Sequence, residues 1–139
     1  FGEHLQAKCV DIVRDAFGKR VFIGAPAQPR ATNAEGRATF YGAPIVYLHA
    51  KISIFDDDHA IIASANLNGR SFAWDTEAGL PTQSPQEVAL LKRRCFSHWL
   101  GEDADQAFYE NETARAAWAD LALTNARSQP AKRRGFSST

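Results

Sequence analysis

Two short apolar segments separated by four polar residues most constrain the fold of this chain. Residues 52–55 (ISIF) and 60–63 (AIIA) flank Asp56-Asp57-Asp58-His59. Isoleucine and phenylalanine favour strands, whereas a cluster of aspartates favours a turn. The pattern therefore predicts a β-hairpin, and the apolar run of its first strand extends back toward residue 41.

The sequences on both sides of the hairpin alternate between helical and extended patterns. Ser84, Pro85 and Glu87 form a typical helix start, with serine as N-cap and proline in the first turn. The other expected elements are a helix over 3–18, a strand over 20–24, a loop over 26–36, an edge strand over 76–80 and helices over 84–100 and 105–123. This order predicts an α/β domain.

The length and charge of the chain limit the number of domains and the kinds of binding partner. Its 139 residues fit one domain, which we place at residues 1–124, followed by a mobile tail at 125–139. The formal net charge is zero, so no global field attracts nucleic acid or an anionic membrane. Lys132-Arg133-Arg134 is expected to be a solvated charge run, with phosphate contact as the alternative. No apolar run is long enough for a transmembrane helix.

Other compositional features indicate a fragment without a metal site. Cys9 and Cys95 are too few for a disulfide framework or a metal site, and we interpret them as structural thiols. The chain begins with Phe1 and contains no methionine, which favours a piece of a longer protein. The sequence leaves the localisation open.

His49 and Lys51 lie on the predicted first strand. Residues two apart in a strand point to the same face, so the imidazole and the ammonium group should project together. Histidine can attack phosphorus or protonate a leaving oxygen, and lysine can neutralise a phosphate. Both residues are therefore predicted to be catalytic.

Three polar residues beyond the hairpin complete this set. Ser64 and Asn66 can donate hydrogen bonds to phosphate oxygens and are predicted to bind substrate. Glu77 is the candidate carboxylate that orients His49 and stabilises its protonated form. These groups can act on a phosphodiester without a metal, and we expect no metal and no other cofactor. Each residue alone would more often be a surface or turn residue; their joint spacing supports a site.

The segment resembles the HKD motif of the phospholipase D superfamily. His49-x-Lys51-x4-Asp56 matches HxKxxxxD, and residues 63–71 (ASANLNGRS) match GSxNxxxRS apart from Ala63, which replaces glycine. Glu77 stands where the family has a glutamate. The resemblance implies an α/β/α sandwich with a mixed sheet, of which this chain is one HKD half. It also implies that Asp56 is a catalytic-motif residue that supports the site without touching the phosphate.

In this superfamily two HKD motifs meet, one histidine forms a phosphohistidine and the other protonates the leaving alcohol. His4, His59 and His98 are not followed by lysine two residues later, so the chain has one H-x-K. The second motif is expected in a longer chain, with a homodimer as the alternative. In a C-terminal half His49 would be the acid/base; otherwise it would be the nucleophile.

Three functions remain open from the sequence. The favoured function is a phosphodiesterase that acts on phospholipid, inactive as an isolated fragment because half of the acid/base pair is absent. The first alternative is a metal-independent endonuclease working as a homodimer, although the neutral charge disfavours a basic groove. The second alternative is a non-catalytic half that serves binding or assembly.

Overall fold

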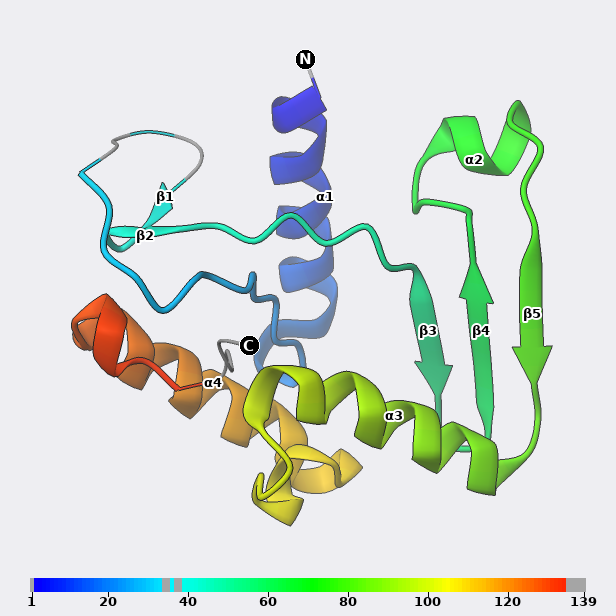
Figure 1. Cartoon of the computed structure of the whole chain (residues 1–139). Coiled ribbons are helices and arrows are strands. Elements are labelled where there is room, and N and C mark those ends of the chain that lie inside the picture. The colour runs from blue at the N-terminus through cyan, green and yellow to red at the C-terminus, as the bar shows by residue number, and fades with distance from the viewer. Residues whose placement is uncertain (1, 34–35, 37–38, 135–139) are drawn as a thin grey trace.

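The computed structural model describes residues 2–33, 36 and 39–134 of the chain. The chain combines helices with two small antiparallel sheets, as expected for an α/β domain (Figure 1). The larger sheet has the strand order β3-β4-β5, and the smaller one pairs β1 with β2. The described strands pair only in antiparallel fashion, so the mixed sheet implied by the resemblance is not found among them.

The predicted hairpin is confirmed and forms most of the larger sheet. Strand β3 (Ile52–Phe55) pairs with β4 (His59–Ala63), and Ile54 lies opposite Ala60. The turn contains Asp56 and Asp57 with positive φ angles of 49° and 60°, a region that aspartate tolerates better than most side chains. Strand β5 (Gly79–Thr82) pairs with the other edge of β4, slightly later than the expected 76–80.

Helix α3 (Pro85–Leu100) follows the sheet and covers part of one face. The side chain of Ser84 accepts a hydrogen bond from the Glu87 N–H, as predicted for the helix start. Val88 of α3 and Ala60 of β4 are 0% and 1% exposed, and the two elements are in contact. Small apolar side chains therefore let the helix approach the strand closely at the turn end of the sheet.

An aromatic cluster joins α3 to the C-terminal helices. The ring of Trp118 lies edge-on to Phe96, at 5.1 Å between centroids, and to Phe108, at 5.4 Å. These edge-on arrangements suit the positive rim and negative face of aromatic rings. The predicted helix over 105–123 is divided into a 3-10 turn, η2 (Gln106–Phe108), and α4 (Asn111–Arg127). Asp105 accepts the Ala107 N–H at 2.8 Å and so caps the short turn separately.

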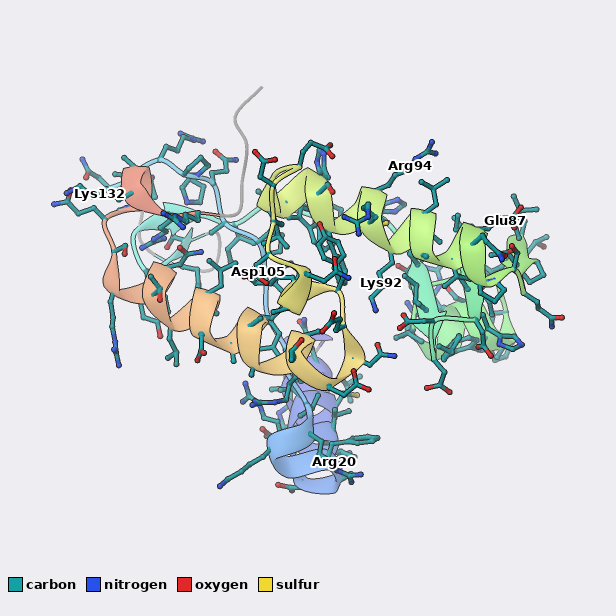
Figure 2. The ribbon with its side chains drawn as sticks, turned by 90° about the horizontal axis from the view of Figure 1, so that it is seen from below. Arg20, Glu87, Lys92, Arg94, Asp105 and Lys132 are labelled. Carbon is teal, nitrogen blue, oxygen red and sulfur yellow. The ribbon has the colours of Figure 1, made fainter. Side chains whose placement is uncertain are left out.

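A buried lysine ties the hairpin turn to both helices. Lys92 of α3 is 9% exposed, and its Nζ donates to Asp57 Oδ1 at 2.7 Å and to Asn111 Oδ1 at 3.2 Å. Figure 2 shows Lys92 directed toward α4, whereas Arg94 on the same helix points outward. A buried ammonium must be paired, so these acceptors fix the position of the turn relative to α3 and α4.

The N-terminal third departs from the sequence prediction. Helix α1 (Gly2–Phe17) is present and is followed by the 3-10 turn η1 (Gly18–Arg20). The predicted strand over 20–24 is wrong, because residues 21–26 have irregular backbone without a ladder partner. A strand needs a neighbour for its backbone groups, and here only Ala27 bridges to Ile45.

The strand expected after Pro44, in the run from Tyr41 to Leu48, is not found, because residues 46–51 have irregular backbone. The chain before them forms a tight hairpin. Strands β1 (Thr39–Phe40) and β2 (Ala43–Pro44) form a hairpin around Tyr41 and Gly42. Both turn residues have positive φ angles, 48° and 75°, as two-residue hairpin turns often require. The continuous apolar sequence concealed this turn.

The C-terminal region is structured beyond the expected boundary at residue 124. Helix α4 extends to Arg127, and a 3-10 turn, η3 (Pro130–Lys132), follows. The guanidinium of Arg133 donates to the carbonyl oxygens of Phe40 and Tyr41, so this member of the basic triplet is engaged by the β1–β2 hairpin. Residues 135–139 of the expected tail lie outside the described residues, and its mobility stays a prediction.

We predict that Lys92→Met destabilises the fold by about 1–2 kcal/mol, because it leaves Asp57 and Asn111 without their buried donor. The Asp57 side chain is 40% exposed, so water replaces part of the lost interaction. Urea denaturation measures the change. The control, Arg94→Met on the exposed side of α3, should remain within about 0.5 kcal/mol of the native chain.

Candidate functional site

Five of the six predicted site residues gather at one end of the β3-β4-β5 sheet. His49 and Lys51 precede β3, Ser64 and Asn66 follow β4, and Glu77 precedes β5. Because neighbouring strands run in opposite directions, these three connections emerge at the same end, next to helix α2 (Gly69–Ala73) (Figure 1). Antiparallel pairing therefore brings together residues up to 28 positions apart in the sequence.

The expected placement of His49 and Lys51 on a strand is wrong. Strand β3 begins at Ile52, and residues 46–51 have irregular backbone, although the Lys51 carbonyl still accepts the Ala63 N–H at 3.0 Å. The Nζ of Lys51 folds back and donates to the His49 carbonyl oxygen at 2.7 Å. The two residues are adjacent through this contact and not through strand alternation. The imidazole of His49 is exposed and lies 6.2 Å from the Tyr47 ring, between centroids.

Ser64 joins β4 to the segment that carries Glu77. Its hydroxyl donates to Glu77 Oε2 and accepts the Ala78 N–H at 3.0 Å. The Ser64 N–H also donates to the Ala78 carbonyl oxygen at 2.9 Å, which continues the β4–β5 pairing beyond the strands. The hydroxyl proton of Ser64 thus serves the carboxylate, whereas the sequence predicted a contact with substrate.

Glu77 is held in its ionised form by two serines. Hydrogen bonds from the Ser64 and Ser71 side chains lower the pKa of Glu77 below its ordinary value, and the positive charge of Lys51 acts in the same direction. Partial desolvation and the charge of Asp75 oppose the shift but are smaller. The result is a stable negative charge at the end of the sheet where His49 and Lys51 lie.

Ser71 is a site residue that the sequence analysis did not single out. It is 7% exposed, in the first turn of α2, and its Oγ accepts the Asn66 N–H at 3.1 Å. Asn68 caps the same helix by accepting the Ser71 N–H at 2.9 Å. Ser71 therefore connects Asn66 to Glu77, and its signal in the sequence was the final serine of the ASANLNGRS segment.

Asn66 presents its side chain at the surface beside this network. Its backbone is fixed on both sides, since its N–H donates to Ser71 and its carbonyl accepts the Asn68 N–H at 2.8 Å. The side chain is exposed. A carboxamide on a fixed backbone can donate to an incoming anion without reordering the chain.

Asp56 lies apart from the other predicted site residues. It follows β3 in the hairpin turn, at the opposite end of the sheet, where it borders a hollow of about 430 Å³ that is also lined by Lys92 and Trp118. The neighbouring Asp57, and not Asp56, pairs with Lys92. The two aspartates therefore shape the turn between β3 and β4. They do not lie with the polar cluster, the name we give to His49, Lys51, Ser64, Asn66 and Glu77.

The arrangement provides an imidazole, an ammonium, a carboxamide and an ionised carboxylate at one sheet end. Within the described part of the chain, no hydrogen bond links the His49 ring to Glu77. In the same residues no group of three or more histidine, cysteine or acidic side chains is placed to hold a metal. No helix among them is long and apolar enough to cross a membrane. The set of side chains can bind and protonate a phosphate ester.

Comparison with known proteins gives one family match and several partial relatives. The family described as "Cardiolipin synthase, PLD-like domain" matches residues 25–99. Phospholipase D alpha 3 of Arabidopsis thaliana is 35% identical over 65 residues, which cover 45% of this chain and 8% of that protein. Phospholipase D alpha 1 of Oryza sativa subsp. japonica is 38% identical over 64 residues, covering 45% of this chain and 8% of that protein.

A third relative gives a shorter match. Phospholipase D alpha 1 of Spuriopimpinella brachycarpa is 43% identical over 47 residues, or 32% of this chain and 6% of that protein. The chain thus matches less than a tenth of the length of these relatives. No solved structure gives a significant match.

We predict that Ser64→Ala raises the pKa of Glu77 toward its ordinary value, because the main donor to the carboxylate is lost. The Ser64 bond stabilises the folded chain above the unfolded pKa of Glu77, and this contribution disappears as the pH falls through the lower folded pKa. Carboxyl-carbon NMR titration of Glu77 measures the shift.

Two variants control this titration. Ser64→Thr keeps a hydroxyl and should keep the pKa low, and Ser53→Ala in β3 should leave the pKa of Glu77 unchanged. An unchanged Glu77 titration in Ser64→Ala would contradict the assignment of Ser64 as the main donor.

Proposed function

Because the chain belongs to the phospholipase D superfamily, we propose that it is one HKD half of a phosphodiesterase acting on phospholipid. The observation that carries the proposal is the meeting of His49, Lys51, Asn66 and an ionised Glu77 at one end of the sheet. The relatives are named phospholipases D, which favours a lipid over other phosphodiesters. The completed enzyme would form an α/β/α sandwich, with helices on the second face of the sheet as well.

In the proposed reaction one histidine nitrogen attacks phosphorus, and the bond from phosphorus to the head-group oxygen breaks. The second histidine gives its proton to that oxygen, so the head group leaves as an alcohol. Water then attacks the phosphohistidine, transfers a proton to the second histidine, and releases phosphatidic acid. As the histidine of a C-terminal half, His49 takes the acid/base role, and the nucleophile belongs to a second motif in a longer chain or a second copy.

The other side chains act on the phosphate and on the imidazole. Lys51 leaves the His49 carbonyl to pair with a phosphate oxygen, and Asn66 donates to another. Glu77 stabilises the protonated form of His49 once the second half orders the ring, and Ser64 and Ser71 hold that carboxylate in place. Asp56 acts indirectly, through the turn that fixes β3.

The charge of the chain argues against the alternative, a homodimeric, metal-independent endonuclease. The formal net charge of the chain is zero, and Arg133 of the basic triplet donates to backbone carbonyls of the β1–β2 hairpin. A nuclease groove needs cations free to contact many phosphates. A purely non-catalytic half would not need an ionised carboxylate at the same sheet end as an exposed histidine and a half-buried lysine.

We predict that His49→Ala, made in the full-length protein that contains this sequence, lowers the rate of choline release from phosphatidylcholine vesicles by at least about 10²–10⁴-fold. The rate falls because His49 no longer donates a proton to the leaving head group. Choline release measures the rate. The matched control is His59→Ala, an exposed histidine at the opposite end of β4, which should retain activity.

The same pair of variants separates the alternatives. Full choline release by His49→Ala would exclude the proposed role of His49. Nicking of plasmid DNA in EDTA, lost in His49→Ala and retained in His59→Ala, would favour the nuclease.

We further predict that the 139-residue chain, held at a concentration where it is monomeric, does not hydrolyse phosphodiesters. One histidine cannot be both the nucleophile and the acid of a single step. The assay is release of nitrophenol from bis(p-nitrophenyl) phosphate, with the monomeric state established by light scattering. Turnover by a demonstrated monomer that depends on His49 would contradict the two-motif mechanism.

A further inference from the structure

Large apolar side chains point into solvent from the connections at the sheet end that carries the polar cluster. We call four of them the apolar rim: Tyr47, Leu67, Phe72 and Trp74, which are 85%, 91%, 69% and 84% exposed. Outside residues 47–80, the most exposed large apolar side chain of the described chain is Tyr41, at 62%. The apolar surface that is least protected from water is therefore concentrated around the candidate site.

The apolar rim borders the polar cluster on two sides. Tyr47 lies beside the imidazole of His49, and Leu67 directly follows Asn66 in the chain. Phe72 belongs to α2, which Figure 1 shows beyond the ends of β4 and β5. A molecule whose phosphate reaches the polar cluster therefore brings its remaining parts against the rim.

The segment that carries most of the rim has no unpaired charge. Residues 66–75 contain one cation and one anion, Arg70 and Asp75, and their side chains pair at 3.0 Å. No cation of this segment is left to contact the successive phosphates of a nucleic acid. The rim is therefore complementary to a partner that is apolar and carries no net charge at its surface.

The rim side chains alternate with polar groups and do not form one continuous apolar patch. Leu67 stands between Asn66 and Asn68, and Trp74 precedes Asp75. Protein interfaces bury a contiguous apolar core inside a polar border. In a bilayer surface, by contrast, leucine and aromatic side chains enter the acyl region while neighbouring polar groups stay among the head groups. The pattern of the rim fits the bilayer.

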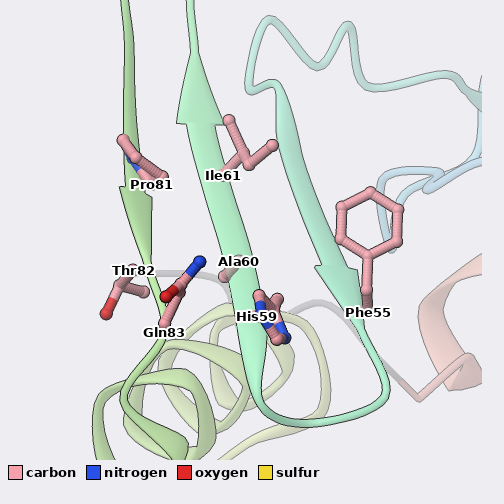
Figure 3. A pocket seen from close by; sticks show the side chains of 7 residues that line it. All are labelled: Phe55, His59, Ala60, Ile61, Pro81, Thr82 and Gln83. Atoms are coloured by element: carbon pink, nitrogen blue, oxygen red, sulfur yellow. The ribbon is translucent and has the colours of Figure 1, made fainter.

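Apolar side chains are also exposed on the sheet itself, in a different setting. Phe55 and Ile61 line a shallow hollow of about 330 Å³, together with the imidazole of His59 (Figure 3). They are 53% and 41% exposed, less than any side chain of the rim. The hollow reaches the turn that joins β3 to β4, at the sheet end opposite the polar cluster. It therefore provides an internal control for contacts made by the rim.

We propose that the apolar rim inserts into the surface of a zwitterionic phospholipid bilayer and holds the polar cluster at the level of the lipid phosphates. Apolar side chains of interfacial segments reach about 5–10 Å into the boundary between head groups and acyl chains. The exposed carboxamide of Asn66 then lies among the phosphates. The identity of the substrate rests on the proposed function, whereas the binding to the bilayer does not depend on catalysis.

The first test is co-sedimentation of the 139-residue chain with phosphatidylcholine vesicles. We expect the chain to bind, and Leu67→Ser to weaken the binding about tenfold, because an apolar side chain is lost from the acyl region. The matched control is Leu123→Ser in α4, an exposed leucine outside the rim, which should bind as the native chain does. No binding, or equal effects of the two variants, would overturn the proposal.

A phenylalanine pair separates the rim from the sheet hollow. Phe72→Ser should weaken vesicle binding, whereas Phe55→Ser, in the hollow of Figure 3, should not. The reverse order would assign the lipid contact to the hollow. Circular dichroism checks that each variant is folded, and the leucine pair decides alone if Phe55→Ser is not.

Trp74 also reports the contact directly. Brominated phosphatidylcholine quenches the fluorescence of tryptophans that touch it, and Trp99 and Trp118 pack against each other away from the rim. We expect brominated vesicles to quench the native chain and to leave the remaining emission of Trp74→Phe unchanged. Equal quenching of both chains, or no quenching of a chain that sediments with vesicles, would place the contact elsewhere.

The last test separates this proposal from the proposed function. In the full-length protein that contains this sequence, Leu67→Ser should lower the ratio of choline release from vesicles to hydrolysis of soluble bis(p-nitrophenyl) phosphate about tenfold. An unchanged ratio would show that the rim does not deliver the bilayer to the site and would overturn the proposal. A protein that binds vesicles through the rim but hydrolyses neither substrate would contradict the proposed function and support the membrane contact.

Discussion

The hydrogen bonding of β4 along both of its edges is the constraint on which the site depends. Its two antiparallel neighbours, β3 and β5, both run in the opposite direction, so three separate chain segments emerge at one sheet end. Ser64 extends this pairing past the strands through one backbone and one side-chain hydrogen bond to Ala78. The residues of the polar cluster therefore meet because the strands pair, and backbone hydrogen bonds fix the positions of their main chains.

The two ends of the sheet differ in how their charged side chains are stabilised. At the site end, His49 is exposed and Lys51 and Glu77 are half-buried, and hydrogen bonds from two serines keep Glu77 ionised. At the turn end, the charge of Lys92 is buried and must be matched by Asp57 and Asn111. The contacts of Lys92 fix the hairpin against α3 and α4, whereas no such buried pairing occupies His49.

Both faces of the larger sheet leave apolar side chains exposed. Helix α3 covers Ala60 at the turn end of one face, but Ile62 and Leu80 on that face are exposed. Phe55 and Ile61 are exposed on the other face. Apolar surface of this kind is stable when a further layer removes it from water.

The sequence by itself determined the elements with local causes. The β3–β4 hairpin follows from two apolar runs around three aspartates, and α3 begins where Ser84, Pro85 and Glu87 predict. The set of six motif residues and the family also came from the sequence, because spacing along the chain carries them. By contrast, the apolar runs at 20–24 and after Pro44 each looked like a strand, but residues 21–26 and 46–51 have irregular backbone and only a single bridge joins the two segments.

Only the tertiary structure decided how those residues are used. It placed Asp56 at the far end of the sheet, gave the Ser64 hydroxyl to Glu77, added Ser71, and put Lys51 on the His49 carbonyl. Ser64 and Glu77 are 13 positions apart, so their contact depends on which strands pair and not on spacing along the chain. The Lys51–His49 contact is local, but it follows from the irregular backbone of residues 46–51, which the sequence had predicted as a strand. Pairing between β4 and β5 sets the first of these contacts, and strand pairing has no local signal in the chain.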